Sequence, residues 1–216
     1  MDIFWEKQDG GLCRKHSLNA YYGHKELSTD VFRNYCKEFD KFVMNKYNYK
    51  IDTGDHDITT QEQLNIIGYI LWKHSNVYTL FIPTRKLGDY LNNCGLKSLH
   101  ELVGDDNFYF VYTPGHVWGH KKHDGKWYKV DSLSGVSRLS DGFDYKGNIP
   151  LGFIIPRSMK MLRKDITTNQ QIILRCFEEH KMKPTEENAR KIIHKYWTNA
   201  DYLGEFEVPI AVLGFH

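Results

Sequence analysis

Two stretches decide the fold: His116-Val117-Trp118-Gly119-His120 and, after a short turn, Lys126-Trp127-Tyr128-Lys129-Val130-Asp131-Ser132. Both are predicted to be β-strands, and Asp124-Gly125 between them is typical of a two-residue hairpin turn, because glycine readily adopts positive φ. Side chains alternate along a strand, so His116, Trp118 and His120 share one face. Folded about this turn, the His116 imidazole is expected to fall nearly opposite the Lys129–Asp131 region, which carries the Asp131 carboxylate. These groups form the base and orienter of a nucleophilic triad, whose third member, a Ser, Cys or Thr, must lie on another element.

The chain before this hairpin is expected to be mainly helical. Three helices are predicted: Cys13 to Tyr22 with Gly23 as C-cap, a helix capped by Ser28 or Thr29, and a helix opened by a capping box of Thr59 and Glu62. A polar loop is expected over residues 45–57.

From residue 77 the spacing of apolar residues changes from a helical period to a period of two. Further strands are predicted at Val77–Ile82, Asn107–Tyr112 and Leu151–Ile155, with a short helix at Lys86–Cys94. Helices followed by an antiparallel meander are typical of an α+β domain with segregated layers. We therefore expect N-terminal helices packed on an antiparallel sheet.

We expect a catalytic domain at residues 1–157 and a C-terminal helical extension at residues 158–216. Helices are predicted in the extension at Thr168–Met182 and Glu186–Trp197, with a possible final strand at Glu207–Leu213. The second helix carries a broad apolar stripe, which must be buried. We expect this stripe to pack on the first domain.

Composition indicates an ordinary soluble protein. Hydrophobic residues make up 41% and charged residues 26% of the 216, and the formal net charge is +2. Nucleic-acid binding is not expected, because it usually needs a concentrated basic face. No apolar run approaches the ~20 residues that a membrane span needs. Met1-Asp2-Ile3-Phe4 does not resemble a signal peptide, so we expect an intracellular protein, cytoplasmic and/or nuclear. We also expect a monomer.

Neither a disulfide framework nor a metal site is expected. The four cysteines are scattered and none forms a C-x-x-C pair, so they are interpreted as thiols. His116 and His120 would stand ~13 Å apart on a strand, and His123 lies in the turn, so the three do not converge on one metal ion.

Cys13 is the candidate nucleophile. It begins the first predicted helix directly after Gly10-Gly11, and the positive end of a helix dipole favours the thiolate. The amide of Gln8 and the backbone N–H of Cys13 are candidate hydrogen-bond donors to the oxyanion of a tetrahedral intermediate. A nucleophile on a helix, with the base and its orienter on neighbouring strands, is the papain-like arrangement.

The N-terminal stretch Ile3-Phe4-Trp5-Glu6-Lys7-Gln8-Asp9-Gly10-Gly11-Leu12-Cys13-Arg14-Lys15-His16-Ser17-Leu18-Asn19 resembles the signature of the Josephin-domain deubiquitinases, a family of papain-like cysteine proteases. The histidine strand and the strand ending in Asp131-Ser132 resemble that family too, with the same fifteen-residue step from His116 to Asp131. The likeness covers roughly residues 2–157 and implies Cys13 as nucleophile, His116 as general base, Asp131 as orienter and Gln8 in the oxyanion hole. One departure is Val117 directly after His116, where the family usually has Trp.

The resemblance implies a thiol-dependent ubiquitin hydrolase. Such an enzyme cleaves the isopeptide or peptide bond after the C-terminal Gly of ubiquitin or polyubiquitin without a cofactor. Trp118 and Gly115 are candidates for lining the narrow substrate groove. The alternatives are a papain-like protease for another ubiquitin-like modifier or a polyprotein, and an inactive ubiquitin-binding module. His16 and His120 are interpreted as structural residues, and a second interpretation of Asp131 is that it only caps a turn with Ser132 and Ser134.

Overall fold

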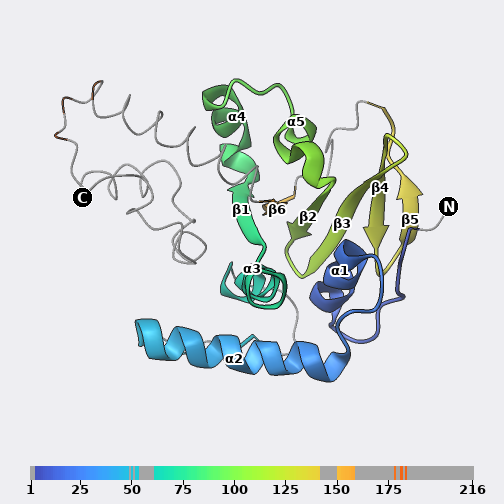
Figure 1. Ribbon diagram of the computed structural model, residues 1–216, viewed down its shortest axis with the longest axis vertical. Helices are drawn as coiled ribbons and strands as arrows, with labels where there is room; N and C mark the ends of the chain where they lie inside the picture. The colour runs from blue at the N-terminus through green and yellow to red at the C-terminus, as the bar shows by residue number, and fades with distance from the viewer. Residues whose placement is uncertain are drawn as a thin grey trace.

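The computed structural model describes residues 3–48, 50, 52–53, 61–141, 150–158, 178, 181 and 183, in which helices pack on a six-stranded antiparallel sheet (Figure 1). The helices are α1 (Cys13–Tyr22), α2 (Thr29–Tyr47), α3 (Gln61–Ser75), α4 (Thr84–Asn93), α5 (Leu99–Val103) and the 3-10 helix η1 (Gly104–Asp106). The strands are β1 (Tyr78–Pro83), β2 (Phe108–Thr113), β3 (His116–His123), β4 (Lys126–Asp131), β5 (Gly135–Arg138) and β6 (Gly152–Arg157). The expected α+β class is therefore confirmed.

The strand order of the sheet is β1-β6-β2-β3-β4-β5. Strands β2 to β5 form a meander, and β6 inserts between β1 and β2 with antiparallel pairing on both sides. The hairpin of β3 and β4 has the predicted two-residue turn. Its residues Asp124 and Gly125 have φ of 49° and 75°, and His123 pairs with Lys126 across it. The positions of β3 and β4, which carry the candidate base and orienter, were thus predicted correctly.

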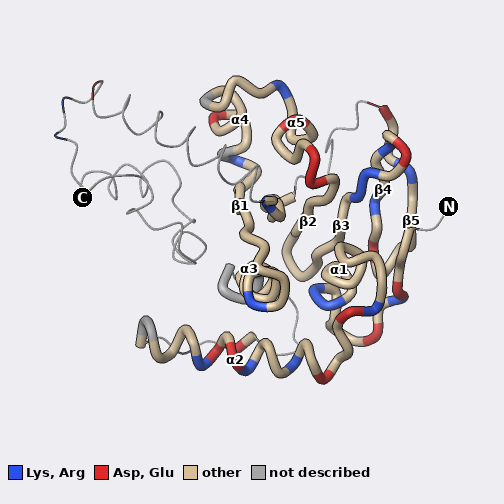
Figure 2. Tube along the Cα trace, viewed as in Figure 1, with Lys and Arg blue, Asp and Glu red and all other residues tan. Residues whose placement is uncertain are grey.

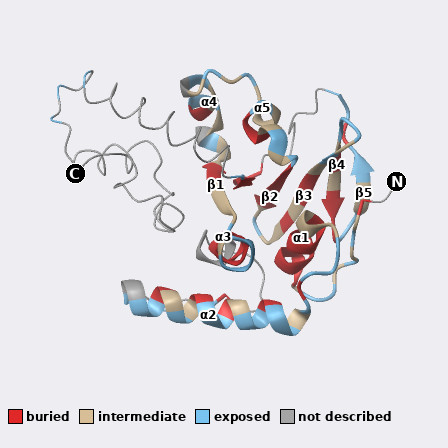
Figure 3. Cartoon of the chain, viewed as in Figure 1, coloured by how far each residue is buried: buried red, intermediate tan, exposed pale blue. Residues whose placement is uncertain are grey.

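Two helical layers cover the two faces of the sheet. On one face, Phe110 and Ile154 belong to a core that also includes residues of α1, α2 and α3. On the other face, Tyr109 and Phe153 pack with residues of α4 and α5. The central strands are therefore buried almost throughout, as Figure 3 shows. The N-terminal helices pack on the sheet as expected. The predicted short helix at Lys86–Cys94 is α4, but α5 and the second layer that these two helices form were not predicted.

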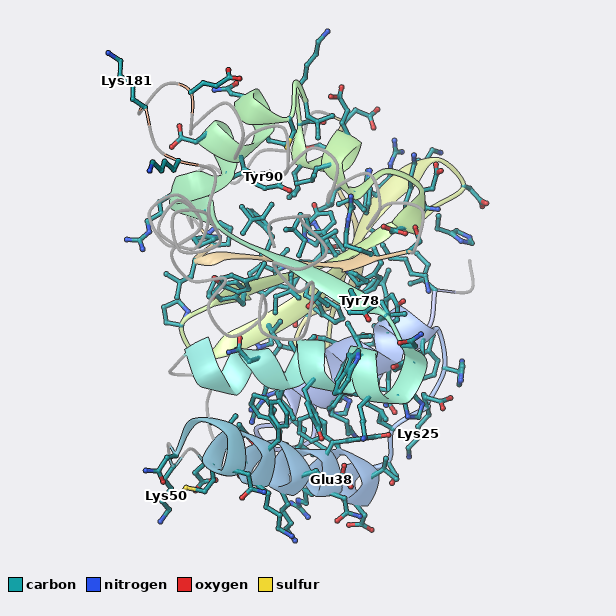
Figure 4. All side chains as sticks on the ribbon, turned by 60° about the vertical axis from the view of Figure 1, so that its left-hand side comes forward. Lys25, Glu38, Lys50, Tyr78, Tyr90 and Lys181 are labelled. Atoms are coloured by element: carbon teal, nitrogen blue, oxygen red, sulfur yellow. The ribbon has the colours of Figure 1, made fainter. Side chains whose placement is uncertain are left out.

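Helix α2 lies outside α3 and is joined to it by aromatic packing. The Tyr69 ring centroid is 5.1 Å from that of Phe39 and 5.9 Å from that of Phe42. Figure 4 shows side chains filling the space between these helices, while Glu38 lies on α2. Helix α2 continues to Tyr47, so its last turn includes Asn45 to Tyr47, which were expected to belong to a loop.

The predicted caps of α1 and α2 lie in the described part of the chain. Gly23 ends α1 in the left-handed conformation with φ of 80°, and its N–H donates to the Asn19 carbonyl. Ser28, rather than Thr29, is the N-cap of α2 and accepts from the Val31 N–H. Thr59 and nearly all of the extension at 158–216 lie outside the described residues, as do the helices and strand expected there.

Charged side chains of both signs are interspersed along the tube in Figure 2. Among the described residues, no group of His, Cys, Asp or Glu is arranged to hold a metal ion. In the same part of the chain, no helix combines the length and apolar character needed to cross a membrane.

Candidate active site

Cys13 is the first residue of α1, and the packing of that helix sets its position. The helix lies against β3, where the Ser17 hydroxyl donates to the Val117 carbonyl at 3.1 Å. Cys13 is a free cysteine with only 3% of its surface exposed. As predicted, the thiol therefore stands where the first-turn N–H groups of the helix have no partner within the helix.

His116 connects the thiol to Asp131. Its Nε2–H donates to Asp131 Oδ1 over 2.8 Å, and its ring also makes a side-chain hydrogen bond with Cys13. Because Nε2 faces the carboxylate, Nδ1 is the ring nitrogen left for the thiol. The β3–β4 ladder ends at the Gly119–Val130 pair, so Asp131 reaches His116 along a diagonal of the hairpin. The structure thus brings Cys13, His116 and Asp131 together.

The electrostatics of this cluster favour a charged imidazole. Burial alone would lower the pKa of His116, but its hydrogen bonds to Asp131 and Cys13, together with the negative charge of both partners, raise that pKa to about 9. Burial would in turn raise the pKa of Asp131. Hydrogen bonds from His116, Lys129 and the Leu133 N–H outweigh burial and hold the Asp131 pKa well below its ordinary value. At neutral pH the pair is therefore an imidazolium beside a carboxylate.

Asp131 has more partners than a triad requires. Its Oδ1 also accepts from the Leu133 N–H at 2.9 Å, and its Oδ2 accepts from the Ser134 hydroxyl at 3.1 Å and from Lys129 Nζ at 2.7 Å. The turn-capping role and the contact with His116 are therefore both present. The carboxylate is held from three directions, so it offers the imidazole a fixed acceptor.

Gln8 is held beside the end of β4 by two hydrogen bonds to Ser132. The Gln8 N–H donates to the Ser132 carbonyl at 2.8 Å, and the Ser132 hydroxyl donates to Gln8 Oε1 at 2.8 Å. Gln8 Nε2 donates to the Gly10 carbonyl at 2.8 Å. An amide nitrogen carries two N–H donors, so this contact uses one of them and leaves the other for a ligand. The predicted oxyanion donor is therefore anchored to the residue that follows the orienter.

His16 belongs to a hydrogen-bond network at the start of α1. Its Nδ1–H donates to Glu6 Oε2 at 2.9 Å, and its Nε2 accepts from the Asp9 N–H at 3.3 Å. Asn19 also donates to Glu6 Oε2, at 2.8 Å. Burial, the largest effect, lowers the pKa of His16, which agrees with a neutral ring that donates through one nitrogen and accepts through the other. This network attaches residues 6–9, and with them Gln8, to helix α1.

Trp118 lies against the His116 ring. The two ring centroids are 5.6 Å apart with an interplanar angle of 27°, and Lys129 Nζ stands 4.7 Å from the Trp118 ring centroid. Gly115 precedes His116 in a turn with φ of 76°. Trp118 therefore contacts the predicted base directly, and Gly115 provides the left-handed backbone conformation that leads into β3.

The sequence interpretation gave no role to Lys129 or Trp5. The period-two pattern of β4 places Lys129 on the same face as Asp131, so a contact between these two side chains could have been predicted from the sequence. Trp5 Nε1 donates to the Asp131 carbonyl at 2.6 Å across 126 positions of the chain. No local pattern predicts a contact of that separation.

A comparison of the chain with protein-family models found no match, and a comparison with curated proteins found none either. A thiol, an imidazole and a buried carboxylate in series can form a thiolate–imidazolium pair, which is an activated nucleophile.

The charge state of His116 can be tested by an NMR titration of its imidazole. We expect the ring to stay protonated at pH 7 and to lose its proton around pH 9, because the free ring pKa of 6.5 is raised by Asp131 and Cys13. The raised pKa stabilises the fold fully below about pH 6.5, and this contribution disappears as the pH rises through 9. His120, whose pKa burial lowers to about 3, is the internal control and should remain neutral throughout. A His116 midpoint near 6.5 would contradict the arrangement.

Proposed function

We propose that the protein is a thiol-dependent ubiquitin hydrolase of papain-like, Josephin type. The observation that supports this proposal best is the series Cys13–His116–Asp131, in which the His116–Asp131 contact of 2.8 Å fixes the imidazole beside the first residue of a buried helix. The reason for proposing ubiquitin as the substrate is that the sequence around Cys13 resembles the N-terminal signature of the Josephin-domain deubiquitinases.

In the proposed reaction, the proton of Cys13 resides on His116 as an imidazolium, and the thiolate attacks the carbonyl carbon of the C-terminal Gly of ubiquitin. The resulting oxyanion accepts hydrogen bonds from the second N–H of Gln8 and from the Cys13 backbone N–H. His116 then protonates the departing lysine amine as the C–N bond breaks, which leaves a thioester. Water, deprotonated by the now neutral His116, hydrolyses the thioester, which restores the Cys13 thiolate beside the His116 imidazolium.

Two exposed apolar side chains stand beside this site. Leu133, 64% exposed, directly follows Ser132, and Trp5, 39% exposed, donates to the Asp131 carbonyl. Both contact Asp131, Trp5 through its indole and Leu133 through its backbone N–H, so they lie on the orienter's side of the proposed site. We assign them to the ubiquitin tail that precedes the scissile bond.

A ubiquitin probe with a C-terminal vinyl electrophile tests nucleophile and recognition together. The native protein should form a covalent adduct at Cys13, and Cys13→Ala should form none. Probes built on other ubiquitin-like modifiers should react much more slowly. Faster labelling by one of those probes would change the substrate but keep the chemistry. Tight binding of ubiquitin with no adduct would indicate the inactive binding module instead.

A further inference from the structure

We propose that His120 and Tyr109 are positioning residues for His116 and act on it through the indole of Trp118. This inference rests on the proposed function of His116 as general base. His120 follows Trp118 by two residues on β3, and Tyr109 stands opposite His120 on β2. All three side chains therefore share the sheet face that carries His116.

A continuous chain of hydrogen bonds joins these residues. Trp118 Nε1 donates to His120 Nε2 at 3.0 Å, and His120 Nδ1 is 2.7 Å from the Tyr109 hydroxyl. The Tyr109 hydroxyl is in turn 3.3 Å from His100 Nε2 on α5. The chain thus runs from beside the predicted base to the helix that covers this face.

The indole determines where the protons of this chain lie. An indole N–H can only donate, so His120 Nε2 must accept and the His120 proton must sit on Nδ1. His120 Nδ1–H then donates to the Tyr109 oxygen, which leaves the Tyr109 hydrogen to donate to His100 Nε2. His120 is 1% exposed, and burial lowers its pKa to about 3, so the ring keeps this neutral form at physiological pH. The orientation of the indole is therefore fixed by a directional network.

The position of the indole matters because its ring faces the imidazole. The hydrogen bonds of His116 to Asp131 and Cys13 lie near the plane of the ring, so the ring can still tilt about the line that joins its two nitrogens. The Trp118 ring, 5.6 Å from the imidazole, limits the tilt on one side, and Lys129 over Trp118 joins the indole to the Asp131 carboxylate. Loss of the His120 acceptor would release the indole and, with it, the imidazole. Displacement by about 1 Å can cost up to ~100-fold in rate.

Val117 cannot provide this support. It is fully buried in the core on the α1 face of the sheet, so its side chain points away from the imidazole. The side chain two residues after His116 is then the first on the same face, and that residue is Trp118.

The test compares variants that remove single polar groups. Tyr109→Phe removes one hydroxyl, His120→Leu removes both ring nitrogens, and His120→Gln restores an acceptor for the indole and a donor to Tyr109. Tyr112→Phe is the matched control, because Tyr112 lies on the same strand but in the core of the opposite face. Each variant is measured for kcat and KM on a ubiquitin conjugate, for the pH dependence of Cys13 alkylation by iodoacetamide, and for Tm.

We expect Tyr109→Phe and His120→Leu to lower kcat by about tenfold with little change in KM, and to shift the alkylation profile. His120→Gln should recover most of the rate, and Tyr112→Phe should match the native protein. The inference is overturned if Tyr109→Phe lowers Tm while kcat and the alkylation profile stay native. If His120→Leu does not fold, Tyr109→Phe still decides, because it deletes a single oxygen.

Alkylation requires no ubiquitin, so it separates this inference from the proposed function. A native protein that fails to cleave ubiquitin, yet shows His116-dependent alkylation that Tyr109→Phe perturbs, would refute the substrate and support the positioning network. A native protein that cleaves ubiquitin, with Tyr109→Phe fully active, would refute the network alone. Finding the His120 proton on Nε2 by nitrogen-15 NMR would also refute it.

Discussion

Cys13→Ala is expected to reduce ubiquitin cleavage by more than about a thousandfold, because covalent catalysis has no substitute for the attacking sulfur. The substitution removes one atom from a side chain that is 3% exposed, so the packing of α1 on β3 should survive. Binding of ubiquitin should also survive, since recognition depends on the groove and not on the thiol. Initial rates on a ubiquitin conjugate, alongside Tm and a binding titration, measure all three effects.

Cys36→Ala is the matched control for this experiment. Cys36 is also 3% exposed, but it lies on α2, which packs outside α3. Its removal should cost a similar amount of packing and leave the cleavage rate within about twofold of native, as expected for a residue away from the chemistry. If Cys13→Ala keeps a tenth of the native activity, Cys13 is not the nucleophile, and Cys36, Cys94 and Cys176 become the candidates.

The parts of the site that could be predicted from sequence are those specified by local signals. Asp124-Gly125 specifies the β3–β4 turn, and the period of two then decides which side chains share a face, so His116 and Asp131 could be paired. The Gly10-Gly11 turn ahead of the predicted helix similarly marked Cys13 as the first residue of that helix. Each of these signals acts within a few residues.

The features that could not be predicted depend on packing between distant segments. Strand β5 has four residues and helix α5 has five, too few for either to show a period. The insertion of β6 beside β2 depends on burial of both strands between two helical layers. For the same reason, the approach of His100 to Tyr109 could not be seen: α5 was not predicted, so its histidine had no expected position.

Asp131→Asn and Asp131→Ala are expected to behave differently, and the contacts of the carboxylate explain why. An asparagine oxygen in the place of Oδ1 can still accept from His116 Nε2 and from the Leu133 N–H. Its amide nitrogen would take the place of Oδ2 and can donate to the Ser134 hydroxyl. The Lys129 ammonium, which lies 2.7 Å from Oδ2 in the native protein, is also a donor, so it and the amide nitrogen would repel each other. Lys129 is partly exposed and can turn toward solvent.

We therefore expect Asp131→Asn to lower kcat by about tenfold and Asp131→Ala by several hundredfold or more, because alanine leaves the imidazole tautomer unfixed. Loss of the negative charge should also lower the pKa of His116 in both variants, since Asp131 is the main partner that raises it. Combining Asp131→Asn with Lys129→Met removes the clash of donors and should recover part of the lost rate. Equal loss in the asparagine and alanine variants would mean that the charge itself is essential for the chemistry. Full activity in both would remove Asp131 from the site and leave it as the cap of the turn formed with Leu133 and Ser134.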